Sequence, residues 1–188
     1  MRTEPLVCSK LLDIMETKPY TQIRVSELVK EAGVSRSSFY FYFDSIETVL
    51  HKVEDDLIAT FPTPDKLSID IAYRKFPSSD NIVSATTEKL AKNLRTFRIL
   101  SGPNGSLSFH DKMYDRVRRI IFLYYGASGI SKKYLEMMTA FLAGSQWELY
   151  RWWANHEDEI TQEEVDKNIN RIYSQLRSSY YEKKPENT

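Results

Sequence analysis

Residues 25–43 restrict the fold of this chain more than any other segment, and they read VSELVKEAGVSRSSFYFYF. Apolar residues three and four positions apart predict a short helix, and Gly33 stands where a left-handed residue would end it. Ser35 can cap a second helix, in which Phe39 and Phe43 lie four apart and are predicted to face a core. Two short helices joined by a tight turn form a helix-turn-helix.

The second predicted helix leaves small polar, charged and aromatic side chains on its outer side. These are Arg36, Ser37, Ser38, Tyr40 and Tyr42. Hydroxyl groups and an arginine near the start of a helix suit the base edges of the DNA major groove. For Phe39 and Phe43 the simplest interpretation is core packing. Tyr40 and Tyr42 lie on the other side of the helix, and contact with DNA is favoured for them.

The rest of the chain also favours an all-α fold. Only 6 of its 188 residues are glycine, whereas about 7% is usual. Apolar residues recur at three- and four-residue intervals in most segments, which predicts about nine helices in all. Outside the helix-turn-helix, the predicted helices cover approximately residues 5–15, 45–61, 83–97, 110–124, 135–153 and 165–180.

Local signals refine these helices and the segments between them. Asp44 and Glu47 are spaced like a capping box at the start of a helix. Residues 67–73 alternate like a strand, but a lone strand has no partner, so an irregular or partly helical connector is predicted there. Residues 101–106 form a predicted loop, and Gly126 with Gly129 marks another break.

A break at Pro62-Thr63-Pro64 marks the predicted boundary between two parts of the chain. Residues 1–61 would hold the helix-turn-helix within a three-helix domain, together with a connecting helix over residues 45–61. Residues 62–188 would form a second helical domain.

Composition disfavours several other classes of protein. No stretch approaches 18 consecutive apolar residues, so no membrane span is expected, and the first residues lack the apolar core of a signal peptide. The single cysteine, Cys8, fits a reducing cytoplasm, where we expect the protein. The three histidines are far apart and belong to no ligand-spaced motif, so neither a metal nor a cofactor is expected.

The balance of charge limits how this chain could bind DNA. Its 26 Lys and Arg residues equal its 26 Asp and Glu residues, and the first 50 residues hold six of the former and seven of the latter. Bulk positive charge therefore does not drive binding, unlike in a basic nucleic-acid coat. Affinity would come from a few placed groups and from two-fold symmetry.

Residues 32–43, AGVSRSSFYFYF, resemble the DNA-binding signature of the TetR family of transcriptional regulators, and the resemblance extends from Leu11 to Leu50. It implies a helix-turn-helix domain over residues 1–61 and a ligand-binding and dimerisation domain over residues 62–188. A weaker resemblance, over residues 93–109 and 144–153, is to a C-terminal subgroup common in low-GC Gram-positive bacteria.

The family implies roles for residues that match its motif. The implied DNA-binding residues are Arg24, Ser26, Ser35, Arg36, Ser37, Ser38, Tyr40 and Tyr42. The chain departs from the family pattern at Ile46, where a lysine that grips phosphate is common. Phe41 and Asp44 also stand where basic or polar residues are frequent. One or two phosphate contacts would then be missing.

The C-terminal helices carry two further sets of candidates. A cavity between helices, or ordinary core, would be lined by Phe97, Met113, Val117, Met137, Met138, Phe141 and Trp147. A four-helix interface between two copies would use Leu135, Leu142, Leu149, Trp152, Val165, Ile169, Ile172 and Leu176. The alternative for the second set is packing within one subunit, and the aromatic residues near Trp152 suit a pocket or an interface equally.

These observations predict a homodimeric, ligand-responsive regulator that binds a palindromic DNA operator and is not an enzyme. Repression is the usual outcome in the family, with a small-molecule effector of unknown identity. One alternative is an activator or co-regulator of the same family that binds no small ligand. Another, from a different class, is a helical-bundle enzyme or small-molecule carrier, which would need convergent polar groups in a cavity.

Overall fold

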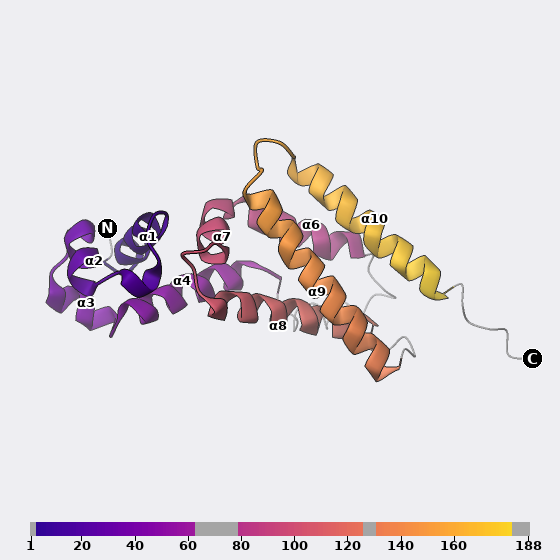
Figure 1. The fold of residues 1–188 in the computed structure, drawn as a ribbon, viewed down its shortest axis with the longest axis horizontal. Coiled ribbons are helices and arrows are strands. Elements are labelled where there is room, and N and C mark those ends of the chain that lie inside the picture. The colour runs from indigo at the N-terminus through magenta and orange to yellow at the C-terminus, as the bar shows by residue number, and fades with distance from the viewer. Residues whose placement is uncertain (1–2, 63–78, 126–130, 182–188) are drawn as a thin grey trace, which may run out of the picture. The chain divides into compact units, whose positions relative to one another are not determined.

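The computed structural model describes residues 3–62, 79–125 and 131–181, and these residues form nine α-helices and one short 3₁₀-helix with no strand. The elements are α1 (Thr3–Met15), η1 (Tyr20–Gln22), α2 (Val25–Ala32), α3 (Arg36–Tyr42), α4 (Ile46–Thr60), α6 (Ser79–Ala91), α7 (Leu94–Ser101), α8 (Leu107–Tyr125), α9 (Lys132–Ala154) and α10 (Gln162–Tyr181). Figure 1 shows their order along the chain. The predicted all-α fold is confirmed. Within the described residues, no helix has the length and apolar character needed to cross a membrane.

The chain divides into two compact units. Unit 1 combines Met1–Thr60 with Asn93–Arg116, and unit 2 combines Phe61–Lys92 with Val117–Thr188. The first stretch of unit 1 ends close to the boundary predicted at residue 61, and α7 with the first part of α8 returns to that unit. The functional division at residue 61 stays a prediction, because packing alone assigns no function to either part.

The core of unit 1 forms where α1, α2, α3 and α4 meet (Figure 1). Its fully buried side chains include Val7, Leu11, Leu28, Phe39, Val49 and Leu50. Phe43 is also buried, so the core role predicted for both phenylalanines of α3 is confirmed. Val49, Leu50 and Val53 of α4 are buried as well, and they hold the helix-turn-helix on the connecting helix.

Two of the predicted helix boundaries are wrong. The N-terminus of α4 is closed by Ser45 and Thr48, because the backbone N–H of Ser45 donates to Thr48 Oγ1 (3.1 Å) and that of Thr48 donates to Ser45 Oγ (3.3 Å). The capping box predicted at Asp44 and Glu47 is therefore shifted by one residue. The reason is that α4 begins at Ile46, which makes Ser45 the capping position.

The single helix predicted over residues 83–97 is two helices, α6 and α7. The chain leaves helical geometry at Asn93, with φ −130° and ψ 21°, and the carbonyl of Asn93 then accepts the first hydrogen bond of α7. Leu90 and Leu94 are both buried. The apolar spacing thus continues across the break, so periodicity alone could not reveal it. The connector over residues 67–73 and the break at residues 126–129 lie outside the described residues.

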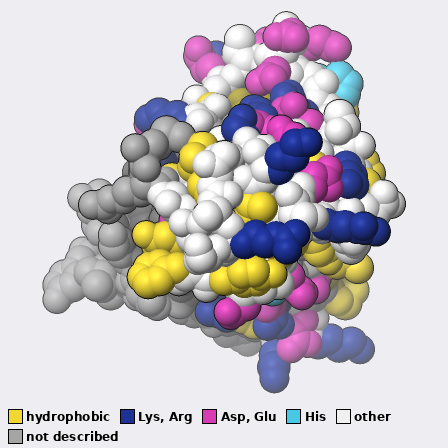
Figure 2. All heavy atoms as spheres, turned by 90° about the vertical axis from the view of Figure 1, so that its left-hand side faces the viewer, with side chains coloured by type: hydrophobic (Ala, Val, Ile, Leu, Met, Phe, Trp, Pro, Cys, Tyr) yellow, Lys and Arg dark blue, Asp and Glu magenta, His cyan; other side chains and the backbone are white. Residues whose placement is uncertain are grey.

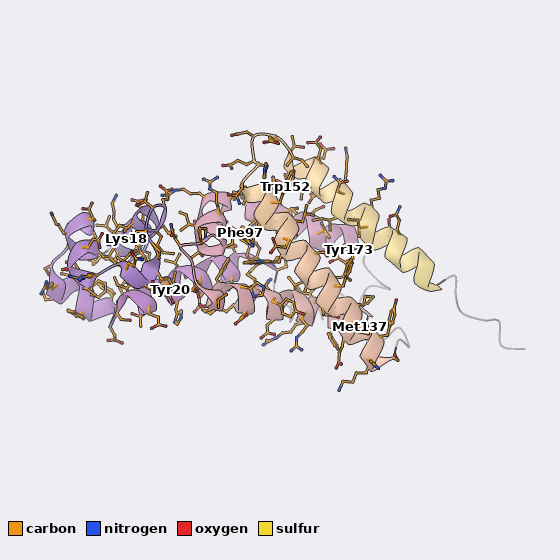
Figure 3. All side chains as sticks on the ribbon, viewed as in Figure 1. Lys18, Tyr20, Phe97, Met137, Trp152 and Tyr173 are labelled. Atoms are coloured by element: carbon orange, nitrogen blue, oxygen red, sulfur yellow. The ribbon has the colours of Figure 1, made fainter. Side chains whose placement is uncertain are left out.

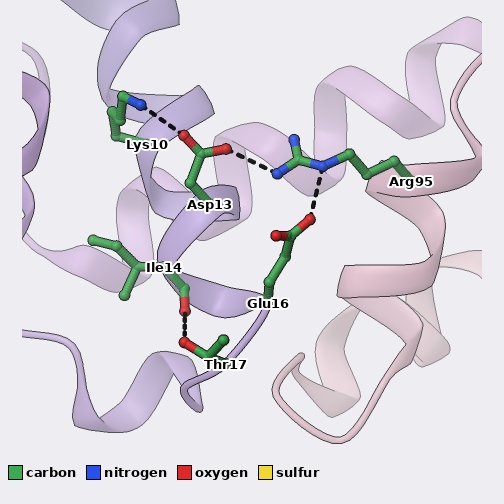
Figure 4. Close-up of polar contacts among 6 residues, drawn as sticks. All are labelled: Lys10, Asp13, Ile14, Glu16, Thr17 and Arg95. Carbon is green, nitrogen blue, oxygen red and sulfur yellow. Dashed lines mark hydrogen bonds and ion pairs between the residues drawn. The ribbon is translucent and has the colours of Figure 1, made fainter.

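Arg95 ties α7 to α1 within unit 1, as Figure 4 shows. Its Nη2 donates to Asp13 Oδ1 and its Nε donates to Glu16 Oε1, both over 2.8 Å. Lys10 Nζ donates to the other oxygen of Asp13, also over 2.8 Å. These hydrogen bonds, first from Lys10 and then from Arg95, lower the pKa of Asp13 below its usual value. One guanidinium therefore joins α7 to Asp13 of α1 and to Glu16, the residue that follows this helix.

Glu54 of α4 is fully buried and is held by the start of α8. Ser106 Oγ donates to its Oε1 over 2.6 Å, Ser108 Oγ lies 2.9 Å from both of its oxygens, and Lys112 Nζ lies 3.1 Å from Oε2. Ser106 directly precedes α8, so the carboxylate also lies at the positive end of that helix. A buried charge needs such partners, and this network fastens α4 to α8.

Lys112 divides its charge between Glu54 and its neighbour Asp55, which it approaches to 2.6 Å. Burial alone would lower the pKa of Lys112, but hydrogen bonds to Asp55 and Glu54 outweigh that effect and raise the pKa above its usual value. Lys112 therefore stays charged at neutral pH.

We expect Glu54→Ala to lower the free energy of unfolding by about 2 kcal/mol, because it removes the buried acceptor that Ser106, Ser108 and Lys112 share. Asp55→Ala is the matched control. It removes a largely exposed partner of the same lysine and should change stability by no more than about 0.5 kcal/mol. Urea unfolding measures both, and equal effects of the two substitutions would contradict a special role for the buried carboxylate.

In unit 2, α10 packs along α6. Val165 and Ile169 of α10 are buried, as are Val83 and Leu90 of α6. The buried Thr87 adds a hydroxyl that donates to a carboxylate oxygen of Asp166, and so joins the two helices. On α9, the fully buried Tyr150 accepts a hydrogen bond from Gln146 Nε2 over 2.8 Å.

Candidate DNA-binding interface

Gly33 forms the turn between α2 and α3. Its φ of 63° and ψ of 31° are left-handed, as predicted. Its N–H donates to Lys30 O over 3.2 Å, and the N–H of Val34 donates to Val29 O over 3.0 Å. These bonds satisfy the last carbonyls of α2 and reverse the chain. A Cβ at Gly33 would meet no atom within 4 Å, so the requirement for glycine is one of backbone conformation.

Ser35 caps the N-terminus of α3, as predicted. Its Oγ accepts from the backbone N–H of Ser38 over 3.0 Å. The hydroxyls of Ser37 and Ser38 lie 2.9 and 2.8 Å from the same oxygen. The three serines therefore form one hydroxyl cluster at the start of α3. Ser35 is committed to the cap and positions the other two.

The structure brings the predicted DNA-contacting residues together on α2 and α3 of unit 1. The exposed members are Arg24, Ser26, Ser35, Arg36, Ser37, Tyr40 and Tyr42, and Ser38 is half-buried. Arg24 and Ser26 lie at the start of α2, and the remainder lie at or within α3. These two helices thus present guanidinium, hydroxyl and phenol groups within one compact unit.

Phe41 belongs to the same surface and was not among the predicted contacts. Its side chain is 79% exposed, compared with 56% for Tyr40 and 47% for Tyr42. The rings of Phe41 and Tyr42 meet edge to face, with centroids 4.9 Å apart. Helical geometry could have identified it, because it lies two residues after the buried Phe39 and so on the opposite side of the helix.

The charge around this surface is mixed rather than basic. Lys18 Nζ lies 2.6 Å from Glu27 Oε2, and this hydrogen bond lowers the pKa of Glu27 below its usual value (Lys18 is labelled in Figure 3). Figure 2 shows Lys and Arg side chains interspersed with acidic and apolar ones on the face it presents. In the described part of the chain, Arg24 and Arg36 form no ion pair. Their guanidinium groups are available to phosphates or bases.

Ile46 occupies the position at which the family commonly has a lysine. Its side chain is buried at the start of α4, beside Ser45. A phosphate contact from this position is therefore absent, and the isoleucine instead contributes to the core.

The candidates for an effector cavity lie in different environments. Phe97 and Met113 are buried in unit 1, where the ring of Phe97 packs against Phe109 with centroids 5.8 Å apart. Met137 and Phe141 are exposed on α9. The half-buried members are Val117, Met138 and Trp147. Their burial thus differs from residue to residue, and the effector cavity stays a prediction.

The candidates for a dimer interface also differ in burial. The members buried within the chain itself are Leu135, Leu142, Val165 and Ile169. Trp152 and Ile172 are exposed, Leu149 is half-buried, and the side chain of Leu176 lies outside the described set.

Cys8 lines a cleft of 380 Å³ between α1, α4 and the start of α7, all in unit 1. Burial raises the pKa of its thiol to about 11, so the thiol stays protonated at neutral pH. A protonated thiol is a poor nucleophile. Among the described residues, no three His, Cys, Asp or Glu side chains are grouped so that they could hold a metal ion.

The module of α2, the Gly33 turn and α3 has the architecture of DNA-binding helix-turn-helix proteins. Residues 11–53 match the model of the family described as "Bacterial regulatory proteins, tetR family". Residues 11–53 are therefore similar to the DNA-binding segment of this family.

A curated relative is similar over a segment of comparable length. The HTH-type transcriptional regulator EthR of Mycolicibacterium smegmatis is 51% identical over 45 residues, which cover 24% of this chain and 21% of that protein. The match thus spans about a fifth of the relative's length.

Solved structures resemble the chain over most of its length. A TetR transcriptional regulator from Streptococcus agalactiae is similar with a TM-score of 0.61 and 19% identity, over 90% of this chain and 92% of that one. The dihydroxyacetone kinase operon activator DhaS is similar with a TM-score of 0.59 and 15% identity, over 94% and 95%. At these identities the likeness concerns the fold alone.

We expect Ser35→Ala to lower the free energy of unfolding by about 1 kcal/mol, because the backbone N–H of Ser38 loses its acceptor. Ser37→Ala is the matched control, since its hydroxyl reaches only Ser35, and it should cost less than about 0.5 kcal/mol. Urea unfolding measures both, and a larger effect at Ser37 would show that the cap has been assigned to the wrong residue.

Proposed function

We propose that this protein is a transcriptional regulator that binds a palindromic DNA operator as a homodimer in the cytoplasm. The proposal rests on the exposed surface of α3, from which Arg36, Ser37, Tyr40 and Tyr42 project. The buried Phe39 anchors this helix in the core of unit 1. Arginine can donate twice to guanine, and serine hydroxyls can bond base edges. The tyrosine phenols can reach phosphate oxygens.

One copy of α3 is too short to specify an operator alone. Its seven residues span about 10 Å, which corresponds to roughly three base pairs at 3.4 Å each. A genome offers on the order of a million or more competing sites. Two copies related by a two-fold axis, about 34 Å apart, would read two half-sites and multiply the discrimination.

The surface that supports dimerisation is an apolar stripe on α9, made of Met137, Phe141 and Trp152. Met137 and Phe141 are 63% and 67% exposed, and Trp152 is also exposed. Figure 3 labels Met137 and Trp152 along this helix. Spacings of four and eleven residues place the three on one side of the helix. Two copies that bring these stripes together would bury them, whereas Leu135 and Leu142 already pack within the chain.

The effector and the sign of regulation are further parts of the proposal. Val117, Met138 and Trp147 are the candidates for contact with a small molecule, since Met137 and Phe141 face outward. Repression is the first hypothesis. Activation is the second, because the similar fold of DhaS belongs to an operon activator. A reporter behind the selected operator, compared in cells with and without the gene, separates the two.

We expect Arg36→Ala combined with Tyr42→Ala to abolish operator binding while helicity and dimerisation persist. Both side chains are exposed, so their loss removes contacts without disturbing the core. The operator is first selected from random duplex oligonucleotides with the wild-type dimer, and binding is then measured by gel shift. Lys133→Ala, an exposed cation on α9, is the control and should bind as the wild type does.

Two results would count against this proposal. Persistent binding by the double variant would refute the assigned surface. Selection of no duplex at all by the folded dimer would refute the regulator hypothesis and favour the enzyme or carrier alternative.

We expect Phe141→Glu to convert the dimer into a monomer, because a charge would be buried in the apolar interface. Ala140→Glu introduces the same charge at the exposed neighbouring residue and should leave the dimer intact. Analytical ultracentrifugation measures both masses. A dimer that survives Phe141→Glu would place the interface elsewhere.

A further inference from the structure

Phe41 is an exposed apolar ring on a helix that otherwise presents polar groups. Its 79% exposure exceeds that of both neighbouring tyrosines. An apolar ring in water is unfavourable, and Phe41 lies within the helix rather than in a loop. Its edge-to-face contact with Tyr42 restrains the ring on the surface. The ring of Phe41 is therefore left largely uncovered by the rest of unit 1.

The geometry of α3 places Phe41 at the centre of the outer face. Successive residues of an α-helix are separated by about 100°. Measured from the fully buried Phe39, Phe41 lies about 200° round the helix and Ser37 about 160°. Tyr40 and Tyr42 lie at about 100° and 300°, on the flanks. A helix that enters the major groove with this face forward meets the bases with Ser37 and Phe41, while the tyrosines face the groove walls.

The chemistry of the ring restricts what it can recognise. A phenyl group has no hydrogen-bond donor and no acceptor, so it cannot bond a phosphate or the polar edge of a base. The C5-methyl group of thymine is the one apolar group that base edges present in the major groove. A methyl group in contact with a phenyl ring removes apolar surface from water on both partners.

We propose that Phe41 determines operator specificity by packing against the C5-methyl group of a thymine, once in each half-site. The inference rests on the proposed function, because it requires that α3 reads DNA. It also accounts for how residues 1–50, which carry no excess of positive charge, would gain sequence preference. The buried Ile46 provides no phosphate contact, so an apolar contact at the centre of the face contributes both affinity and discrimination.

The test removes the methyl group from the DNA and the ring from the protein. Each thymine of the selected operator is replaced in turn, in both half-sites, by 2′-deoxyuridine, which lacks only the C5-methyl. At one symmetric position the wild-type affinity should fall roughly fourfold per methyl group, or about fifteenfold for the pair. Phe41→Ala should weaken binding to the thymine operator and lose the sensitivity to deoxyuridine at that position.

Two matched variants distinguish Phe41 from its neighbours. Phe41→Leu keeps an apolar side chain and should retain part of the sensitivity to deoxyuridine. Tyr40→Ala removes a flanking ring and should leave the full sensitivity at the same position. Circular dichroism and the dimer mass confirm that each variant is folded, which the exposure of both side chains favours.

The outcomes distinguish failure of the Phe41 proposal from failure of the proposed function. Failure of the wild type to select any duplex refutes the proposed function. Binding that is indifferent to deoxyuridine at every thymine refutes the role of Phe41 alone. That role is equally refuted if Phe41→Ala binds as tightly as the wild type, or if it retains the wild-type sensitivity to deoxyuridine.

Discussion

The buried carboxylate of Glu54 is the interaction on which the arrangement of unit 1 depends. It is fully buried on α4 and is satisfied by Ser106, Ser108 and Lys112 at the start of α8. A buried charge tolerates little displacement, since it loses solvation and partners together. Val49 and Leu50 of the same helix are buried in the core that supports α3. The polar network and the apolar core therefore both hold the connecting helix α4.

The candidate DNA-binding surface on α2 and α3 carries a few individual polar, charged and aromatic side chains, without an excess of positive charge. Some cations of the N-terminal segment are paired with acidic residues, as Lys18 is with Glu27. Arg24 and Arg36, in contrast, remain exposed. Aromatic side chains cover much of the remaining surface of α3. If this surface binds DNA as proposed, its balanced charge would attract DNA only weakly at long range. Specificity would then depend on side-chain geometry and on the distance between two symmetric copies.

Helical periodicity predicted which residues belong to the apolar side of each helix. It did not show which of them are buried in the core and which stay exposed. Leu135 and Trp152 fit the same three-four pattern on α9, yet the first is buried within the chain and the second is exposed. The spacing permits both, because a pattern of apolar residues wider than one face can serve the core and a second surface. Only the packed neighbours of the helix separate these two roles.

The helix-turn-helix followed from the sequence itself, because its determinants are local. Gly33 is needed for a left-handed turn and Ser35 for a cap, and each acts within four residues of its own position. Glu54, Ser106 and Lys112 had no such signal, since Glu54 lies more than 50 positions from the other two and meets them only when α8 packs against α4. The same is true of the break at Asn93, across which the apolar spacing is unbroken. The sequence thus determined the module that is proposed to contact DNA, whereas tertiary packing decided how that module is held, because a buried charge is paired only by residues that the fold brings to it.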